Sequence, residues 1–335
     1  MKGPAPLPRT AGELERRVGA AALARAELDL GDTTLVRLVN GAGDGLPGVM
    51  LDRYDRHGVL HLVTDEAIAA KDKLLDAAER LDLDGVYLKA HPRTARTMTP
   101  EERFELAPAE PSRGVAAPLT LEVRERGLRL VTRLGDGLGT GVYPDQRNSR
   151  TRLSALLEGK SLLNLFGYTG AFSVAASRAG ARRTVTVDLS KTSLAWAAEN
   201  FRCNDEAWDP SRHLLLAEDA VGYLAKARAK GSRFDAVVLD PPSFATHKGG
   251  RFSVEEDYAS TVAACLAVLA PSGTLLAVTN HRQISAAAHR AMVLSAARAA
   301  GREVERVDVP PPPADFPVDP DTKEPATKAL FLHVR

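Results

Sequence analysis

The 335-residue sequence has little cysteine, few aromatic residues and almost no net charge. Only two cysteines occur, Cys203 and Cys265, which excludes a disulfide framework and a zinc cluster built on thiolates. No apolar run approaches the roughly 18–20 residues of a membrane span, and the N-terminus has no signal-peptide core. We therefore expect a cytoplasmic protein without membrane contact, and we expect no metal site.

Charge by itself does not predict a nucleic-acid partner, because the formal net charge is +1. One stretch departs from this balance. Between Arg124 and Arg152 there are seven arginines against three carboxylates, an excess of four positive charges. A solvated charged face explains that excess as well as a phosphate-binding surface does.

Composition divides the chain into four parts, and its length favours two domains. The Pro-rich start predicts a loose N-terminal arm over 1–32. Short strand-like runs with one helix between them predict a small α+β domain over 33–110, which we assign to substrate recognition. A linker and a β-hairpin follow over 111–140. A catalytic domain is expected over 141–335.

Strand-like runs and helical runs alternate from Gly159 onward, which predicts a mainly parallel sheet with helices on both faces. Pro310–Pro313 would stop a helix between the last two strands, so we expect the final strand to insert antiparallel. The predicted fold is an α/β, doubly wound, Rossmann-like domain with seven strands. The runs that we interpret as strands are 161–166, 184–188, 213–217, 234–240, 274–279, 303–309 and 329–334.

A candidate cofactor site follows the first of these strands. A Gly-x-x-Gly turn, Gly167 to Gly170, joins it to a helix, and glycine lets a backbone pass close to a ligand. Acidic residues end the next three strands, at Asp188, Glu218–Asp219 and Asp240. Ligands of such sheets bind at the carboxyl ends of the strands, where carboxylates can accept from ribose hydroxyls or an adenine amine.

The turn lacks the third glycine of a dinucleotide fingerprint, which cradles a pyrophosphate. S-adenosylmethionine carries no phosphate and needs no such cradle. The spacing of 21 positions from Gly167 to Asp188 suits a ribose-binding carboxylate. We therefore predict S-adenosylmethionine as the cofactor.

A series of ordered motifs runs through most of the chain, at 37–48, 52–54, 141–148, 164–172, 187–190, 199–200, 218–219 and 234–244. With these motifs the sequence resembles the bacterial base methyltransferases of large-subunit (23S) ribosomal RNA, in both their cytosine-C5 and guanine-N7 branches. The resemblance implies a class I methyltransferase. It also implies the cofactor residues Gln146, Arg147, Asn164, Phe166, Gly167, Tyr168, Thr169, Gly170, Asp188, Leu189, Ser190, Asn200, Glu218, Asp219 and Asp240.

The family also implies an acceptor side, formed by Asp240, Pro241, Ser243, Phe244, Asn280 and His281. Asp240, Pro241 and Ser243 offer polar and backbone contacts to a base. Phe244 either stacks on the base or packs under its loop. His281 is either a base or orienter, or a surface histidine that merely follows a strand.

Two features depart from the family. A PUA-type RNA-binding domain often comes first, and we expect the residues before Thr33 to be too few for one. The cytosine-C5 branch also needs a cysteine at the end of the fifth strand, because a thiolate must add to carbon 6 of the base. Asn280 stands there instead, and Asn280-His-Arg282 is similar to the Asn-Asn-Lys-Arg arrangement of the guanine-N7 branch.

The leading hypothesis is therefore direct transfer to a nitrogen of a ribosomal RNA base, with ribosomal RNA as the partner. A ring nitrogen already has a lone pair, so catalysis reduces mostly to positioning. Three alternatives stay open: a methyltransferase for a small-molecule acceptor, a cytosine-C5 enzyme, and an RNA-binding factor without turnover. A homodimer is also left open.

Overall fold

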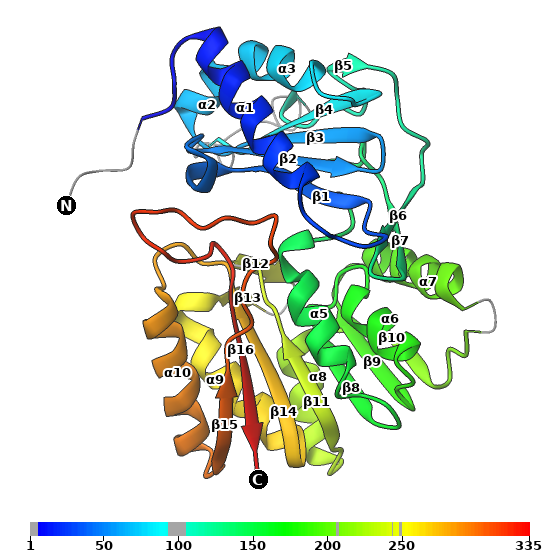
Figure 1. The fold of residues 1–335 in the computed structure, drawn as a ribbon. Coiled ribbons are helices and arrows are strands. Elements are labelled where there is room, and N and C mark those ends of the chain that lie inside the picture. The colour runs from blue at the N-terminus through cyan, green and yellow to red at the C-terminus, as the bar shows by residue number, and fades with distance from the viewer. Residues whose placement is uncertain (1–5, 93–104, 206–207, 243, 248–249) are drawn as a thin grey trace. The chain divides into compact units, whose positions relative to one another are not determined.

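The computed structural model describes residues 6–92, 105–205, 208–242, 244–247 and 250–335. The chain forms two compact units (Figure 1). Unit 1 contains Met1–Pro144 and Pro312–Pro325, and unit 2 contains Asp145–Pro311 and Ala326–Arg335. The chain thus returns to unit 1 shortly before its C-terminus, which the sequence did not predict.

Unit 1 is built on a five-stranded sheet of order β1-β2-β3-β4-β5, in which only β3 and β4 pair parallel. Its apolar core lies between this sheet and helices α1 and α3. The strands are β1 (Leu35–Asn40), β2 (Val49–Tyr54), β3 (His57–Leu62), β4 (Gly85–Ala90) and β5 (Arg113–Gly114), and the short helices are η1 (Gly41–Asp44), α2 (Asp65–Ala69) and α3 (Lys71–Glu79). The expected α+β character is present, with a second strand, β2, that we did not expect.

The expectation of a loose arm over 1–32 is wrong, because Ala11–Ala26 forms helix α1. Thr10 caps it by accepting a hydrogen bond from the Glu13 amide at 3.3 Å. Leu14, Val18 and Ala21 recur at helical spacing and are buried in the core of unit 1. The prolines of the N-terminal segment end at Pro8, before the apolar stripe begins.

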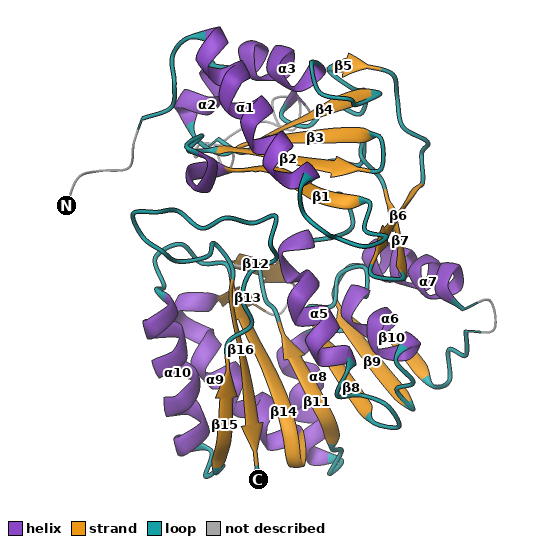
Figure 2. Ribbon diagram, viewed as in Figure 1, coloured by secondary structure: helices purple, strands orange, loops and turns teal. Residues whose placement is uncertain are grey.

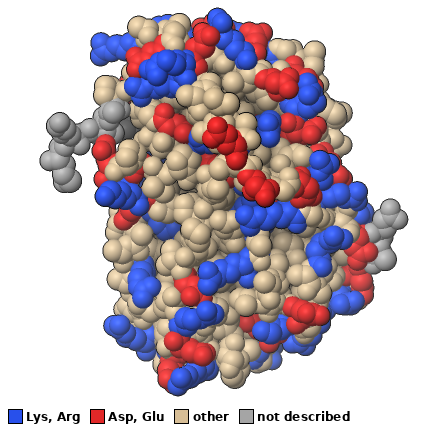
Figure 3. Space-filling model, in the orientation of Figure 1, with Lys and Arg blue, Asp and Glu red and all other residues tan. Residues whose placement is uncertain are grey.

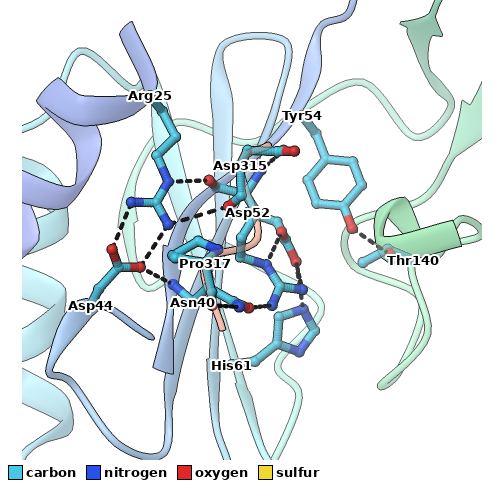
Figure 4. A network of polar contacts seen from close by, with 10 residues as sticks. Arg25, Asn40, Asp44, Asp52, Tyr54, His61, Thr140, Asp315 and Pro317 are labelled. Atoms are coloured by element: carbon cyan, nitrogen blue, oxygen red, sulfur yellow. Dashed lines mark hydrogen bonds and ion pairs between the residues drawn. The ribbon is translucent and has the colours of Figure 1, made fainter. Parts of the chain in front are cut away.

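A buried polar network holds the returning segment in unit 1 (Figure 4). Arg25 makes a bidentate ion pair with Asp44 at 2.6 and 2.7 Å, and Arg37 makes one with Asp52 at 2.6 and 3.1 Å. The Asp315 carboxylate accepts from the Arg37 amide at 2.9 Å. Both arginines are paired with carboxylates, as burial requires, and the network ties the segment at 312–325 to β1 and α1.

The expected β-hairpin is present as β6 (Leu121–Glu125) and β7 (Leu128–Thr132), joined at Arg126–Gly127. Its strands alternate between buried and more exposed side chains, and the apolar Leu121, Val123, Leu128 and Leu130 are among the buried ones. Arg124 and Arg129, two of the seven clustered arginines, lie opposite each other on the exposed face. Figure 3 shows one face of the molecule, on which positive and negative side chains are interspersed, in keeping with the near-neutral net charge.

Unit 2 confirms the predicted doubly wound fold. Its seven-stranded sheet has the order β10-β9-β8-β11-β14-β16-β15, and only β16 runs antiparallel to its neighbours (Figure 2). The strands are β8 (Ser161–Leu165), β9 (Arg183–Asp188), β10 (His213–Ala217), β11 (Phe234–Leu239), β14 (Leu269–Thr279), β15 (Val304–Asp308) and β16 (Lys328–Val334). The helices are α5 (Arg147–Ser154), α6 (Ala171–Arg178), α7 (Lys191–Asn204), α8 (Ala220–Ala229), α9 (Val254–Val268) and α10 (Ala286–Ala299).

Alternate residues of the central strands enter two separate apolar cores, one on each face of the sheet. On β8, Leu163 and Leu165 pack in the core with helices α8 to α10, whereas Leu162 packs in the core with α5 and α6. The near-continuous apolar runs seen in the sequence arise because both faces are covered. A small hairpin, β12 (Phe244–His247) and β13 (Gly250–Ser253), follows β11 where we had expected a loop.

Register brings the carboxyl ends of five parallel strands to one edge of the sheet. Leu165 of β8 pairs with Val187 of β9 and with Leu239 of β11, and Leu239 pairs in turn with Ala277 of β14. The residues that follow these strands are therefore neighbours. No helix in the described part of the chain is long and apolar enough to cross a membrane.

Candidate cofactor and acceptor site

The turn after β8 has an unusual backbone. Phe166 and Tyr168 adopt positive φ angles of 54° and 49°, which bulky residues rarely do, and Gly170 follows with 73°. Hydrogen bonds hold this conformation, among them one from the Gly167 amide to the Val187 carbonyl at 3.0 Å. Strained backbone of this kind persists only where its surroundings enforce it, and it is concentrated at ligand sites.

Gly167 is required by the close approach of the turn to β9. A Cβ built at this position would lie 2.4 Å from Cγ2 of Thr186. Beneath the turn, the buried Ser173 hydroxyl joins two neighbouring side chains, since it lies 3.1 Å from Asn164 Nδ2 and 2.7 Å from Thr186 Oγ1. The side-chain amide of Asn200 donates to the Thr169 carbonyl at 2.9 Å. Asn164 and Asn200, both predicted as cofactor residues, thus support the turn from below.

Asp188 lies at the end of β9 and is bonded to the same turn. Its Oδ2 accepts from the Tyr168 amide and its Oδ1 from the Ser190 amide, both at 2.8 Å. Each carboxylate oxygen can accept two hydrogen bonds, so acceptor capacity remains for hydroxyl groups. Leu189, the next residue, is 44% exposed and presents an apolar surface beside it. Ser190 caps helix α7 by accepting from the Ser193 amide.

The pair Glu218–Asp219 follows β10. Asp219 caps helix α8, where its Oδ2 accepts from the Gly222 amide at 2.7 Å. Glu218 forms a 2.7 Å ion pair with Lys226. Of the two carboxylates, Asp219 is thus bound to the backbone, whereas Glu218 pairs with a surface lysine.

Gln146 and Arg147 begin helix α5 and are only 3% and 1% exposed. The Gln146 Oε1 atom is buried and has no hydrogen-bond partner among the described residues. A buried acceptor without a partner is costly, so a donor from a ligand would stabilise it. The preceding residue, Asp145, accepts a short hydrogen bond from the Thr327 hydroxyl.

Asp240 directly follows β11 and has an unusual protonation equilibrium. Burial and, to a smaller extent, the charge of Asp145 raise the pKa of its carboxyl to about 7, against the opposing charge of Arg150. Pro241 is buried beside it. Ser243 lies outside the described residues, and Phe244 begins β12, where only its backbone is described.

The loop after β14 carries Asn280, His281 and Arg282. Asn280 and Arg282 are exposed, and His281 is half-buried. The His281 amide donates to Thr279 Oγ1 and its carbonyl accepts from Lys328 Nζ, both at 3.2 Å. Neither cysteine reaches this edge of the sheet: Cys203 donates to the Asn200 carbonyl within α7, and Cys265 is buried in α9, where burial raises its thiol pKa.

Sequence reasoning missed a buried pair behind this loop. The Tyr258 hydroxyl donates to the Val278 carbonyl at 2.8 Å and lies 2.9 Å from Nε2 of His289. Burial lowers the pKa of His289 to about 4, so the ring is neutral and its Nε2–H donates to the tyrosine oxygen. The described residues also contain no group of three or more histidine, cysteine, aspartate or glutamate side chains arranged to hold a metal ion.

Comparison with known proteins places this geometry in a family. The sequence model described as S-adenosylmethionine-dependent methyltransferase matches residues 100–332. YwbD of Bacillus subtilis (strain 168), named as a ribosomal RNA large subunit methyltransferase, is 36% identical over 264 residues, which are 78% of this chain and 64% of YwbD. Ribosomal RNA large subunit methyltransferase I of Klebsiella pneumoniae is 32% identical over 305 residues, which are 91% of this chain and 75% of that protein.

Solved structures agree with the sequence comparisons. The methyltransferase SMU.776 complexed with SAH superposes with a TM-score of 0.84 at 28% identity, over 98% of this chain and 83% of that one. A SAM-dependent methyltransferase from Streptococcus mutans has a TM-score of 0.83 at 27% identity, over the same shares. The chain thus spans just under two thirds of YwbD and most of each of these structures. It belongs to the S-adenosylmethionine-dependent methyltransferase family, and it is an enzyme that takes its methyl group from S-adenosylmethionine.

Proposed function

We propose that this enzyme methylates a base in the RNA of the large ribosomal subunit, by direct transfer to a nitrogen such as N7 of guanine. The substrate class rests on one observation: 91% of this chain is similar to a protein whose name gives that RNA as its substrate. The choice of a nitrogen as the acceptor atom rests on a second observation. Asn280 stands at the strand end where the cytosine-C5 mechanism needs a cysteine.

The residues at the cofactor side fit S-adenosylmethionine. Gln146 Oε1 is a buried acceptor that suits an ammonium donor, and Asp188 has acceptor capacity left for two ribose hydroxyls. Leu189 offers an apolar surface for a flat ring, beside which Asp219 would accept from the adenine amine. The bound cofactor supplies an electrophilic methyl group on a sulfonium.

The acceptor side fits a nucleophile that needs no activation. Cys265 is buried in α9 and Cys203 lies on α7, so neither thiol can add to a base held at the carboxyl edge of the sheet. A ring nitrogen attacks through its own lone pair. The task of Asp240 and Asn280 is then to hold the base in line with the methyl group, and orientation of this kind lowers barriers by several kcal/mol.

Asp240 also gives a reason to prefer guanine. Guanine is the RNA base with two adjacent N–H donors on its Watson–Crick edge, and an ionised carboxylate accepts both. Because the pKa of Asp240 is about 7, this acceptor is available to half of the molecules near neutral pH and to more of them at higher pH. Methyl transfer should therefore increase as the pH rises through 7.

A labelling experiment tests the proposal. The purified enzyme is incubated with methyl-tritiated S-adenosylmethionine and, in parallel, with large ribosomal subunits, protein-free 23S RNA and a metabolite extract. Nuclease digestion and mass spectrometry then identify the labelled product. We expect 7-methylguanosine from the RNA. Label confined to the metabolite extract would overturn the substrate, and 5-methylcytidine would overturn the mechanism.

A further inference from the structure

The connection from β15 to β16 is long and irregular. From Val309 to Thr327 it is fully described and contains no helix or strand. Loops of this length inside compact domains are uncommon and are usually functional or disordered. This one is ordered by specific contacts along its length.

The middle of the connection is fixed within unit 1. Asp315 is fully buried, and its carbonyl accepts from Arg25 Nη2 at 3.2 Å (Figure 4). The Pro317 carbonyl accepts from Asn40 Nδ2 at 2.8 Å. The Arg37 guanidinium lies over the Phe316 ring, 4.5 Å from its centre. These contacts offset the conformational entropy that ordering such a loop costs.

The end of the connection is fixed within unit 2, by two adjacent side chains. Thr327 donates a short hydrogen bond to the Asp145 carboxylate. Lys328, the first residue of β16, is only 7% exposed, and its ammonium donates to the His281 carbonyl at 3.2 Å. Burying an ammonium is costly, and pairing β16 with β14 needs only backbone groups. The buried ammonium of Lys328 is therefore best explained by its hydrogen bond to the His281 carbonyl.

The two groups held belong to the two sides of the candidate site. Asp145 directly precedes Gln146, whose buried Oε1 faces the cofactor in the proposed function. His281 lies in the loop with Asn280, on the acceptor side. Adjacent residues at the start of one strand thus contact both the turn before α5 and the loop after β14.

We propose that Thr327 and Lys328 are positioning residues for methyl transfer. Thr327 holds the Asp145–Gln146 turn in place for the cofactor, and Lys328 holds the Asn280–His281 loop in place for the acceptor. The acceptor half of this inference rests on the proposed function. The two residues should therefore affect different kinetic constants, which a merely structural role at the start of β16 would not do.

Thr327 is tested by cofactor affinity alone, which needs no RNA. Isothermal titration with S-adenosylhomocysteine should show about tenfold weaker binding for Thr327→Val, because a hydrogen bond to a carboxylate is lost at constant side-chain shape. Thr327→Ser keeps the hydroxyl and should restore the affinity to within about twofold. Thr322→Val is the matched control, since Thr322 is exposed in the same connection. Unchanged affinity in Thr327→Val would overturn this half of the proposal.

Lys328 is tested by turnover and by hydrogen exchange. Lys328→Met should lower kcat on ribosomal RNA about tenfold at saturating S-adenosylmethionine, and leave the affinity for S-adenosylhomocysteine within about twofold. Amides of residues 279–284 should exchange faster, and Lys328→Arg should recover part of both changes. Lys323→Met, at an exposed lysine of the same connection, is the control.

The outcomes separate this inference from the proposed function. If the wild-type enzyme leaves RNA unlabelled, the proposed function fails, and the titration and exchange measurements still decide the positioning roles. If Thr327→Val does not fold, Asp145→Asn removes the same charged acceptor and has the same expected result. Equal losses of affinity and turnover in both variants, or unchanged exchange at 279–284 in Lys328→Met, would overturn the inference.

Discussion

The two halves of the sheet's carboxyl edge are built differently. On the cofactor half, the turn after β8 is bonded to β9, to Asp188 and to α7. On the acceptor half, Asn280 and Arg282 are exposed, and the loop is held by Thr279 and by Lys328 from a distant part of the chain. The tightly bonded half is the one that we propose for S-adenosylmethionine.

This difference also explains which half of the site could be predicted from the amino-acid sequence. Contacts around the turn after β8 join successive elements of the chain, such as the fit of Gly167 against Thr186 on the next strand, and they restrict residue types at fixed spacing. Other contacts join segments farther apart, such as Asp145 with Thr327 on the cofactor half and His281 with Lys328 on the acceptor half. Such contacts leave no periodic or spaced pattern.

Asp188→Ala should weaken S-adenosylhomocysteine binding by about a hundredfold or more. The variant removes the acceptor for the ribose and also leaves the Tyr168 and Ser190 amides without their carboxylate. Isothermal titration measures the loss. Asp209→Ala, at a half-buried carboxylate that accepts from Ser211 in the turn before β10, is the control. An affinity within threefold of the wild type would show that the cofactor half is wrongly placed.

Gly167→Ala should destabilise the protein by about 1–3 kcal/mol and weaken cofactor binding about tenfold, because the new Cβ would meet Thr186 at 2.4 Å. Urea unfolding and titration measure the two effects. Gly12→Ala is the matched control, since a Cβ there meets nothing within 4 Å and the residue lies in helix α1. That control should be neutral or stabilising by about 0.4–1 kcal/mol. Equal changes in stability and in cofactor affinity for the two variants would contradict the steric clash with Thr186.

Asp240→Asn should change the pH dependence of stability. The pKa of Asp240 is raised to about 7 in the folded enzyme, mainly by burial, and is near 3.9 in the unfolded chain. The wild-type carboxyl therefore stabilises fully below pH 4, and this stabilisation is lost as the pH rises through 7. Since Asp240 keeps some solvent access, we expect the asparagine variant to gain about 1–2 kcal/mol over the wild type between pH 5 and pH 8.

Urea unfolding of both proteins at pH 5 and pH 8 measures this gain, and Asp209→Asn, in the turn before β10, serves as the control. The same variant should lose most methyl transfer at pH 8, because it lacks the carboxylate that accepts from the base. A pH-independent difference in stability would contradict the raised pKa. Full activity of the variant would remove Asp240 from the acceptor half.

Cys203→Ala and Cys265→Ala should leave methyl transfer within about twofold of the wild type. Cys265→Ala should cost about 1 kcal/mol of stability, because it leaves a small cavity in the core between the sheet and α9. RNA that contains 5-fluorocytidine should form no trapped adduct with either variant or with the wild type. An adduct, or loss of activity in one alanine variant, would restore the cytosine-C5 mechanism, in which a thiol on the acceptor half adds to the base.

Prediction of the fold succeeded where periodicity is strong. The alternation from Gly159 onward predicted the parallel sheet and the antiparallel final strand, because both faces of that sheet must be covered by apolar helices. It failed at α1, where Leu14, Val18 and Ala21 form a short stripe after a Pro-rich start. It also missed the return of 312–325 to unit 1, since a buried ion network pairs residues far apart in sequence.

The amino-acid sequence alone determined the doubly wound fold and the cofactor, because glycines and carboxylates at strand ends act through neighbours on the next element along the chain. Tertiary structure alone decided that Asn164 and Asn200 support the turn, that Asp240 titrates near neutrality, and that Thr327 and Lys328 hold the two sides of the site. Those properties depend on burial and on partners that folding brings together from distant parts of the chain.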